Sequence, residues 1–384
     1  MLFTPGLSKR GWLSVLGVMV LAAAGRVCLA QSDSAVTVTP LDSPLENNRP
    51  LATVPLPDLI DEAIAITSRR HLSADKHTPW QICHGVLALR DNYYILKDGK
   101  KIKALDWIAS GPEFDGKPWW LTTEHGGKGH PFTKPYHFEG HPNQFLALFT
   151  LCRLPRDYSF KAGDKTITVE DIINNAKMEA NDEEEMTWTL WFLAFYLDPN
   201  SEWLNQKGEA WSIERMIKKQ MEMPVTKSAC GGMHGLFAIA MARNAHLQAG
   251  RPLMGIWLEG HIHVQRHIEM AKRMQNADGS FSSNYYKGPG QTDDVSKRLS
   301  TTGHTLEMMM GALPQAALEE EYIQKAARRI ATDLIESRMQ SLEPGGMYHA
   351  LNAIVIYRER MWPERVKPVV HEVAKPAAGE TAIR

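Results

Sequence analysis

The 384-residue chain is 43% hydrophobic, and its 43 basic residues nearly balance its 44 acidic residues. The length suits one large domain with a substantial core. The balance of charge excludes binding of nucleic acid, or adsorption to an anionic membrane, through overall charge.

The first 30 residues have the layout of a secretory signal peptide. Lys9 and Arg10 precede an apolar run over residues 12–24, and Ala30 offers a small residue for cleavage before Gln31. This run is shorter than the ~20 residues that a spanning helix needs, so we expect export to the periplasm or the exterior without a permanent membrane anchor. Cleavage would leave 40 basic against 44 acidic residues, because three basic residues lie in the segment.

The rest of the chain divides into three parts. Residues 31–56 are rich in Ser, Thr, Pro and Asn and predict a flexible leader, and residues 367–384 predict a loose tail. The folded domain is therefore expected over residues 57–366. Of the four cysteines, Cys28 lies in the predicted signal peptide, and the remaining three, Cys83, Cys152 and Cys230, allow at most one internal disulfide, which excludes a disulfide-rich scaffold.

Two sets of segments predict helices. Six apolar segments begin with small or capping residues and are hydrophobic nearly all round, which predicts buried inner helices; they start at Thr78, Phe138, Met186, Ala229, Ser300 and Pro344. Amphipathic segments predict outer helices over residues 59–72, 169–180, 213–222, 257–275 and 322–339, and residues 104–110 predict only a short stub of an outer helix in the second, less regular repeat. A short β-hairpin is expected around Asp98-Gly99.

Six alternations of an outer and an inner helix predict an all-α fold, an (α/α)6 toroid of six helical hairpins with loop insertions at one rim. An open solenoid of helix pairs is the alternative. Residues 275–281, Gln-Asn-Ala-Asp-Gly-Ser-Phe, resemble the Q-x-x-D-G-S-[FW] turn of terpenoid cyclases and protein prenyltransferase β subunits. The resemblance implies the toroid fold and leaves the reaction open.

Aligning the six inner segments places polar and aromatic residues at equivalent positions. The first tier is His84, His141, Trp188, His234, His304 and His349, and the tier three residues later is Leu87, Gln144, Trp191, Phe237, Glu307 and Asn352. Buried polar groups without partners are costly, so these tiers predict a solvated pocket at the common start of the inner helices. Helix N-termini meeting there would favour an anionic ligand.

Two long loops add candidate site residues at the same rim. The first, before His141, contains Glu124, His125, His130, His137 and Glu139. The second, before His304, contains Tyr285, Tyr286, Lys287, Asp293, Asp294, Lys297 and Arg298. A divalent metal is a candidate cofactor, with His125, His137 and His141 as its ligands, although the spacing is not that of an HExxH zinc helix.

Three functions remain open from the sequence. The first is an enzyme on a charged polysaccharide: a lyase with His141 or His304 as base and Lys287 or Arg298 as the neutralising cation, or a hydrolase with Glu139 and Glu307 as its carboxyl pair. The second is isoprenoid chemistry. The family resemblance supports it, and so do the aromatic side chains of Trp188, Trp191 and Phe237, which suit a carbocation. The third is a non-catalytic scaffold that binds a small molecule or glycan.

Overall fold

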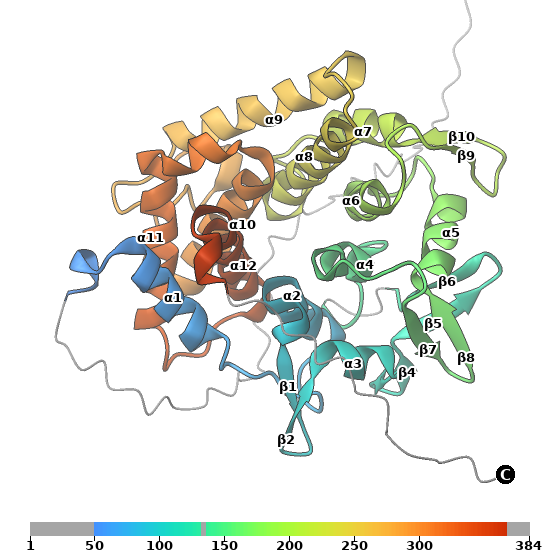
Figure 1. Ribbon diagram of the computed structural model, residues 1–384, viewed down its shortest axis with the longest axis horizontal. Helices are drawn as coiled ribbons and strands as arrows, with labels where there is room; N and C mark the ends of the chain where they lie inside the picture. Colours follow the sequence, from blue (N-terminus) through green and yellow to red (C-terminus); the bar gives the residue numbers. More distant parts are fainter. Residues whose placement is uncertain (1–49, 132–135, 367–384) are drawn as a thin grey trace, which may run out of the picture.

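The computed structural model describes residues 50–131 and 136–366, and this part is mostly helical, with twelve α-helices and five two-stranded sheets (Figure 1). The predicted signal peptide, the tail and residues 31–49 of the leader lie outside the described residues. The end of the leader is ordered, because Arg328 donates hydrogen bonds to the carbonyl oxygens of Leu51 and Val54. In the described ranges no helix has the length and apolar character to cross a membrane.

The even-numbered helices correspond to the six apolar segments. Each packs against the next one in chain order, and α12 packs against α2, so the contacts return to the first helix. Figure 1 shows these helices around the middle of the molecule. They are α2 (Pro79–Leu89), α4 (Gln144–Phe149), α6 (Thr187–Tyr196), α8 (Met233–Gln248), α10 (Val295–Ala312) and α12 (Pro344–Met361).

The odd-numbered helices lie outside them and are amphipathic. In α7, for example, Ile213, Met216 and Ile217 are buried while Glu214 faces outward, as expected for a helix with one face on a core. Their bounds are α1 (Leu56–Thr67), α3 (Ala104–Ala109), α5 (Val169–Glu179), α7 (Ile213–Glu222), α9 (Gly255–Arg273) and α11 (Glu321–Glu336). These bounds lie within a few residues of the predicted ones, except that α1 ends earlier than expected.

Five antiparallel hairpins make the prediction of an all-α fold too narrow. They pair β1 (Tyr94–Lys97) with β2 (Lys100–Lys103), β3 (Glu113–Phe114) with β4 (Lys117–Pro118), β5 (Trp120–Thr123) with β6 (Gly126–Gly129), β7 (Ser159–Ala162) with β8 (Lys165–Thr168), and β9 (Glu202–Leu204) with β10 (Ala210–Ser212). The first confirms the predicted hairpin, since Asp98 and Gly99 both have positive φ, as a type I′ turn requires. The others have strands too short for an alternating pattern to be visible in the sequence.

Three of these hairpins lead directly into an outer helix and set its starting point. Strands β2, β8 and β10 are followed at once by α3, α5 and α7. The Thr168 side chain accepts a hydrogen bond from the Asp171 amide, and the Asp171 carboxylate accepts one from the Thr168 amide. This capping box satisfies amide groups that the first turn of α5 would otherwise leave unpaired.

The Gln275–Phe281 turn lies between α9 and α10, the outer-to-inner junction expected from the sequence. Gln275 Nε2 donates to the carbonyl oxygen of Tyr322 on α11 at 2.7 Å. Gly279 has a φ of +89°, and a Cβ there would lie 2.5 Å from the Lys325 carbonyl oxygen, also on α11. The turn therefore joins one outer helix to the next, and its glycine is required by close approach of the backbone.

Candidate functional site

Four imidazoles from four different inner helices meet in the interior. They are His84 of α2, His234 of α8, His304 of α10 and His349 of α12, here called the histidine cluster. The ring centroids of His304 and His349 are 4.0 Å apart, and His234 lies 4.8 Å from His304 and 4.9 Å from His349. His84 lies 5.1 Å from His349. The structure thus brings together four of the six residues that the sequence alignment matched.

The cluster differs from the predicted site in its position along the helices and in its exposure. Only His234 lies in the first turn of its helix, whereas α10 begins at Val295, well before His304, and α12 at Pro344, before His349. The predicted placement at the helix starts was therefore wrong for α2, α10 and α12, although the aligned histidines do lie at a common level and contact one another. All four side chains are buried, the most exposed at 7%, so they do not line an open solvated pocket.

Burial keeps the cluster uncharged at neutral pH. It lowers the pKa of His84 to about 3 and that of His304 to about 4, although each Nδ1–H donates to a backbone carbonyl one turn earlier, of Trp80 or Ser300, at 2.6 Å. Burial, followed by the neighbouring imidazoles, also lowers the pKa of His234 and His349. A neutral imidazole carries one nitrogen lone pair, so each ring can accept a hydrogen bond or bind a metal.

A chain of buried, hydrogen-bonded polar groups contacts the Nδ1 side of the His349 ring. Its Nδ1 is 2.7 Å from Oε2 of Glu307, Asn352 Nδ2 donates to Oε1 of the same carboxyl, and Arg90 Nη1 donates to Asn352 Oδ1 at 2.8 Å. Burial raises the pKa of Glu307 to about 8, because the opposing effects of Asn352 and Arg90 are smaller. Both shifts favour the uncharged forms at neutral pH, since burial raises the pKa of Glu307 and lowers that of His349.

His141 and Glu185 form a second, more accessible pair. His141 Nδ1 lies 2.6 Å from Glu185 Oε2, and the two side chains are 26% and 23% exposed. Burial acts to raise the pKa of Glu185, but hydrogen bonds and charge from His141, with a further bond to Thr187, lower it overall. The ring of Trp188 lies 5.6 Å from His141 and 4.5 Å from His234, so this aromatic ring separates the pair from the histidine cluster.

Glu185 was missed in the sequence because it ends the acidic run 182–185, which resembles a solvated helix start. Its partner lies 44 positions earlier in the chain. Only the packing of α4 beside α6 brings them together, and no local pattern indicates that contact.

The other predicted site residues of the inner helices have structural roles. Trp191 packs between Trp188 and Phe237 at centroid distances of 5.6 and 4.6 Å. Gln144 accepts a hydrogen bond from the Gly140 amide at 2.8 Å, and Glu139 accepts one from the Phe145 amide at 2.9 Å. These buried contacts fix the start of α4. The carboxyls of Glu139 and Glu307, the predicted hydrolase pair, are both buried and occupied in separate hydrogen-bond networks.

The second predicted loop contributes mainly to the scaffold. Asp294 caps α10 through the Lys297 amide, and Arg298 Nε and Nη2 donate to the two carboxylate oxygens of Asp333 at 2.9 and 2.7 Å. The Arg298 guanidinium is thus paired with Asp333, which neutralises the charge that the prediction assigned to an anionic ligand. Tyr286 is buried against Met233, whereas Lys287 is exposed.

Metal-compatible groups lie in a different place from the predicted triad. Within residues 50–131 and 136–366, two sets of His, Cys, Asp or Glu have ligand atoms within 4.8 Å of one another: Cys230 with His234 and His304, and His234 with Glu307 and His349. Neither set includes the predicted ligands. His125 is at the tip of the β5–β6 hairpin near Gln206, His137 contacts the Phe114 ring, and His141 pairs with Glu185.

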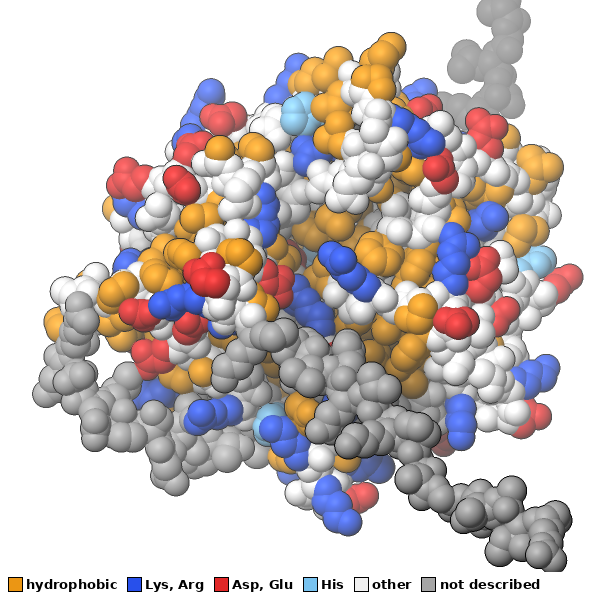
Figure 2. All heavy atoms as spheres, in the orientation of Figure 1, with side chains coloured by type: hydrophobic (Ala, Val, Ile, Leu, Met, Phe, Trp, Pro, Cys, Tyr) orange, Lys and Arg blue, Asp and Glu red, His pale blue; other side chains and the backbone are white. Residues whose placement is uncertain are grey.

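On the face drawn in Figure 2, basic and acidic side chains are interspersed with apolar ones over the described part of the surface. This mixture agrees with the near-zero net charge of the chain. Comparison of the sequence with protein-family models and with curated proteins, and of the structure with solved structures, gives no match.

Proposed function

We propose that this protein is an exported enzyme with an (α/α)6 toroid fold that acts on a charged polysaccharide, as a lyase or a hydrolase. The fold part of the proposal is supported by the order of helix contacts, in which α12 returns to α2 and the odd-numbered helices lie outside. The export part is supported by the composition of residues 1–30.

The observation that carries the activity is the His141–Glu185 pair. A carboxylate at 2.6 Å from Nδ1 fixes the ring and its tautomer and leaves Nε2 as the basic nitrogen. Because both side chains are partly exposed, a substrate can reach this imidazole, whereas His304 is buried. In a lyase reaction His141 would remove the proton beside the uronate carboxylate.

A lyase also needs a positive charge to neutralise that carboxylate. The sequence predicted Lys287 or Arg298 as this cation. Arg298 forms an ion pair with Asp333, so the exposed Lys287 is the one that can contact a substrate carboxylate. A divalent metal held near the histidine cluster is the alternative source of charge, and we include it in the proposal as the cofactor. For a hydrolase, the same imidazole would activate water.

The test is turnover of a panel of uronate-containing and neutral glycans by the purified protein. Ultraviolet absorbance of an unsaturated product would identify a lyase, and new reducing ends without that absorbance would identify a hydrolase. His141→Ala should lower the rate by ~10²–10⁴-fold, the usual contribution of a general base. Glu185→Gln should also lower it, whereas Glu184→Gln, at an exposed neighbouring position, should not. Absence of turnover across the panel, or an unchanged rate in His141→Ala, would contradict the proposal.

A further inference from the structure

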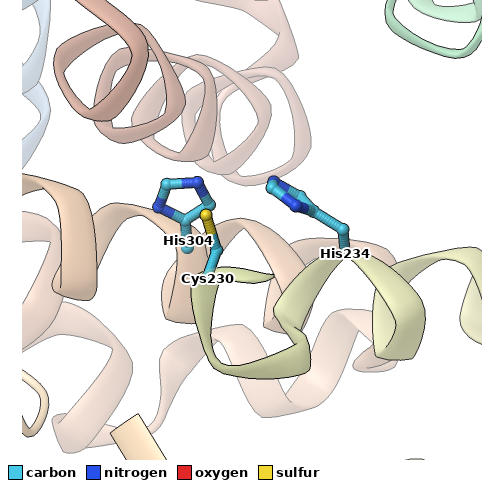
Figure 3. Close-up of side chains that lie close together, drawn as sticks. All are labelled: Cys230, His234 and His304. Atoms are coloured by element: carbon cyan, nitrogen blue, oxygen red, sulfur yellow. The ribbon is translucent and has the colours of Figure 1, made fainter. Parts of the chain in front are cut away.

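We infer that Cys230, His234 and His304 form a binding site for one divalent ion of the zinc class. The three ligand atoms lie within 4.8 Å of one another, and the side chains come from the turn before α8, the first turn of α8, and α10. Figure 3 shows all three pointing to the same side of the ribbon, with the Cys230 thiol beside the His304 ring. This inference stands whether or not a glycan is the substrate.

The nitrogen atoms needed for such a site are available. His304 Nδ1 donates to the Ser300 carbonyl oxygen at 2.6 Å, which assigns the lone pair of this ring to Nε2. His234 is 7% exposed, and its Nε2 is buried without a hydrogen-bond partner. A buried polar atom without a partner is energetically costly. A metal ion bound to this nitrogen would remove that cost.

The backbone conformation just before α8 places the Cys230 thiol close to the imidazoles of His234 and His304. Cys230, Gly231 and Gly232 are three consecutive residues with positive φ, at 48°, 63° and 75°. A left-handed conformation is unfavourable at a non-glycine residue and persists only where surrounding contacts enforce it. Gly231 is required for a second reason, since a Cβ there would lie 2.3 Å from the ring of Tyr285.

The ligand types select the class of ion. Thiolate is a soft ligand and imidazole an intermediate one, a combination that favours zinc and disfavours magnesium and calcium, which prefer oxygen. A catalytic zinc site usually has three protein ligands and one position open to water or substrate. A structural zinc site has four protein ligands.

His349 lies beside the three proposed ligands and belongs to the second metal-compatible set. Its Nε2 is buried without a hydrogen-bond partner, and its Nδ1 contacts Glu307. A carboxyl group that contacts the second ring nitrogen of a metal-binding imidazole is the usual outer support of a metal centre. Because the Glu307 oxygens are already occupied by His349 and Asn352, we assign Glu307 to support of the His349 ring and Cys230 to direct binding.

The test is metal binding by the full exported chain, measured without any glycan. After removal of metal by a chelator, the wild-type protein should rebind one zinc ion per chain. Loading with cobalt should produce a thiolate-to-cobalt charge-transfer band in the near ultraviolet. Cys230→Ser should abolish this band and weaken zinc binding by at least the ~10–100-fold that loss of an outer partner costs.

Cys152→Ser is the matched control, because this thiol is partly buried and belongs to neither metal-compatible set. It should leave stoichiometry and band unchanged. If Cys230→Ser does not fold, His304→Gln provides the second ligand variant and should weaken zinc binding equally. Wild-type protein that binds no stoichiometric zinc would overturn the inference, as would a band that persists in Cys230→Ser. Zinc binding without a thiolate band in the wild type would instead assign the ion to His234, Glu307 and His349 and overturn the role of Cys230.

Discussion

Individual residues in this protein show how burial can decide the charge state of a side chain. Glu307 and Glu139 are both buried, and the pKa of each is raised to about 8 by loss of contact with water. Glu139 accepts a hydrogen bond from the Phe145 amide, which favours the ionised form, but desolvation has the larger effect. A buried carboxyl of this kind is held in its neutral form by the fold.

Glu139 makes a pH-dependent contribution to stability whose sign follows from this shift. The folded protein keeps the proton up to pH about 8, whereas an unfolded chain releases it near the ordinary pKa of 4.5. The contribution is therefore full below pH 4.5, decreases as the pH rises toward 8, and changes no further above that value. One proton gives a slope of about 1.4 kcal/mol per pH unit.

Glu139→Gln tests this contribution, because glutamine can still accept the Phe145 hydrogen bond but does not ionise. Urea unfolding across that pH range should show a flatter decline of the free energy of unfolding in the variant than in the wild type. The exposed Glu183→Gln should follow the wild-type profile. Parallel profiles for Glu139→Gln and wild type would show that this carboxyl is not neutral in the folded protein.

At the level of secondary structure, the sequence predicted the helices better than the strands. The apolar segment from Ala229 and the amphipathic segment 213–222 repeat their pattern over several turns, so both helices were predicted. The bounds of α7 were accurate, whereas α8 begins at Met233, later than predicted. The β7–β8 hairpin was missed because its four-residue strands are too short for such a pattern.

The close packing of helices α10 and α12 predicts that a larger side chain at their contact will lower stability. A Cβ added at Gly303 would lie 2.6 Å from the backbone of Ala350, so Gly303→Ala must separate two inner helices that carry His304 and His349. We expect a loss of about 1–3 kcal/mol in the free energy of unfolding, as for other overpacked interiors.

Gly260→Ala is the matched control for Gly303→Ala. Gly260 is also inside a helix, but an added Cβ there meets only side-chain methyl groups of Ile239 and Ile217, at 3.1 and 3.3 Å. The gain in helix propensity should offset this contact. Equal thermal stability of the two variants would show that the α10–α12 crossing tolerates expansion.

At the scale of the whole molecule, the aligned histidines predicted which inner helices face one another and at which residues, but neither where those helices begin nor the chemistry around the histidines. His304 was matched to His234 by sequence, yet one lies within its helix and the other in a first turn. Glu185 and Cys230 could not be found, since their contacts with His141 and with His304 are made only by packing of separate helices. The predicted triad of His125, His137 and His141 came from closeness in sequence, and the structure gives each of these residues a different neighbour.

Separate inner helices converge on one cluster of metal-compatible side chains, which we propose binds zinc. X-ray diffraction from zinc-loaded crystals, recorded on both sides of the zinc absorption edge, tests this directly. We predict one anomalous peak at ~2.0–2.3 Å from Cys230 Sγ and from Nε2 of His234 and His304. A well-ordered crystal structure in which these three side chains lie apart, or in which the zinc peak lies elsewhere, would contradict it.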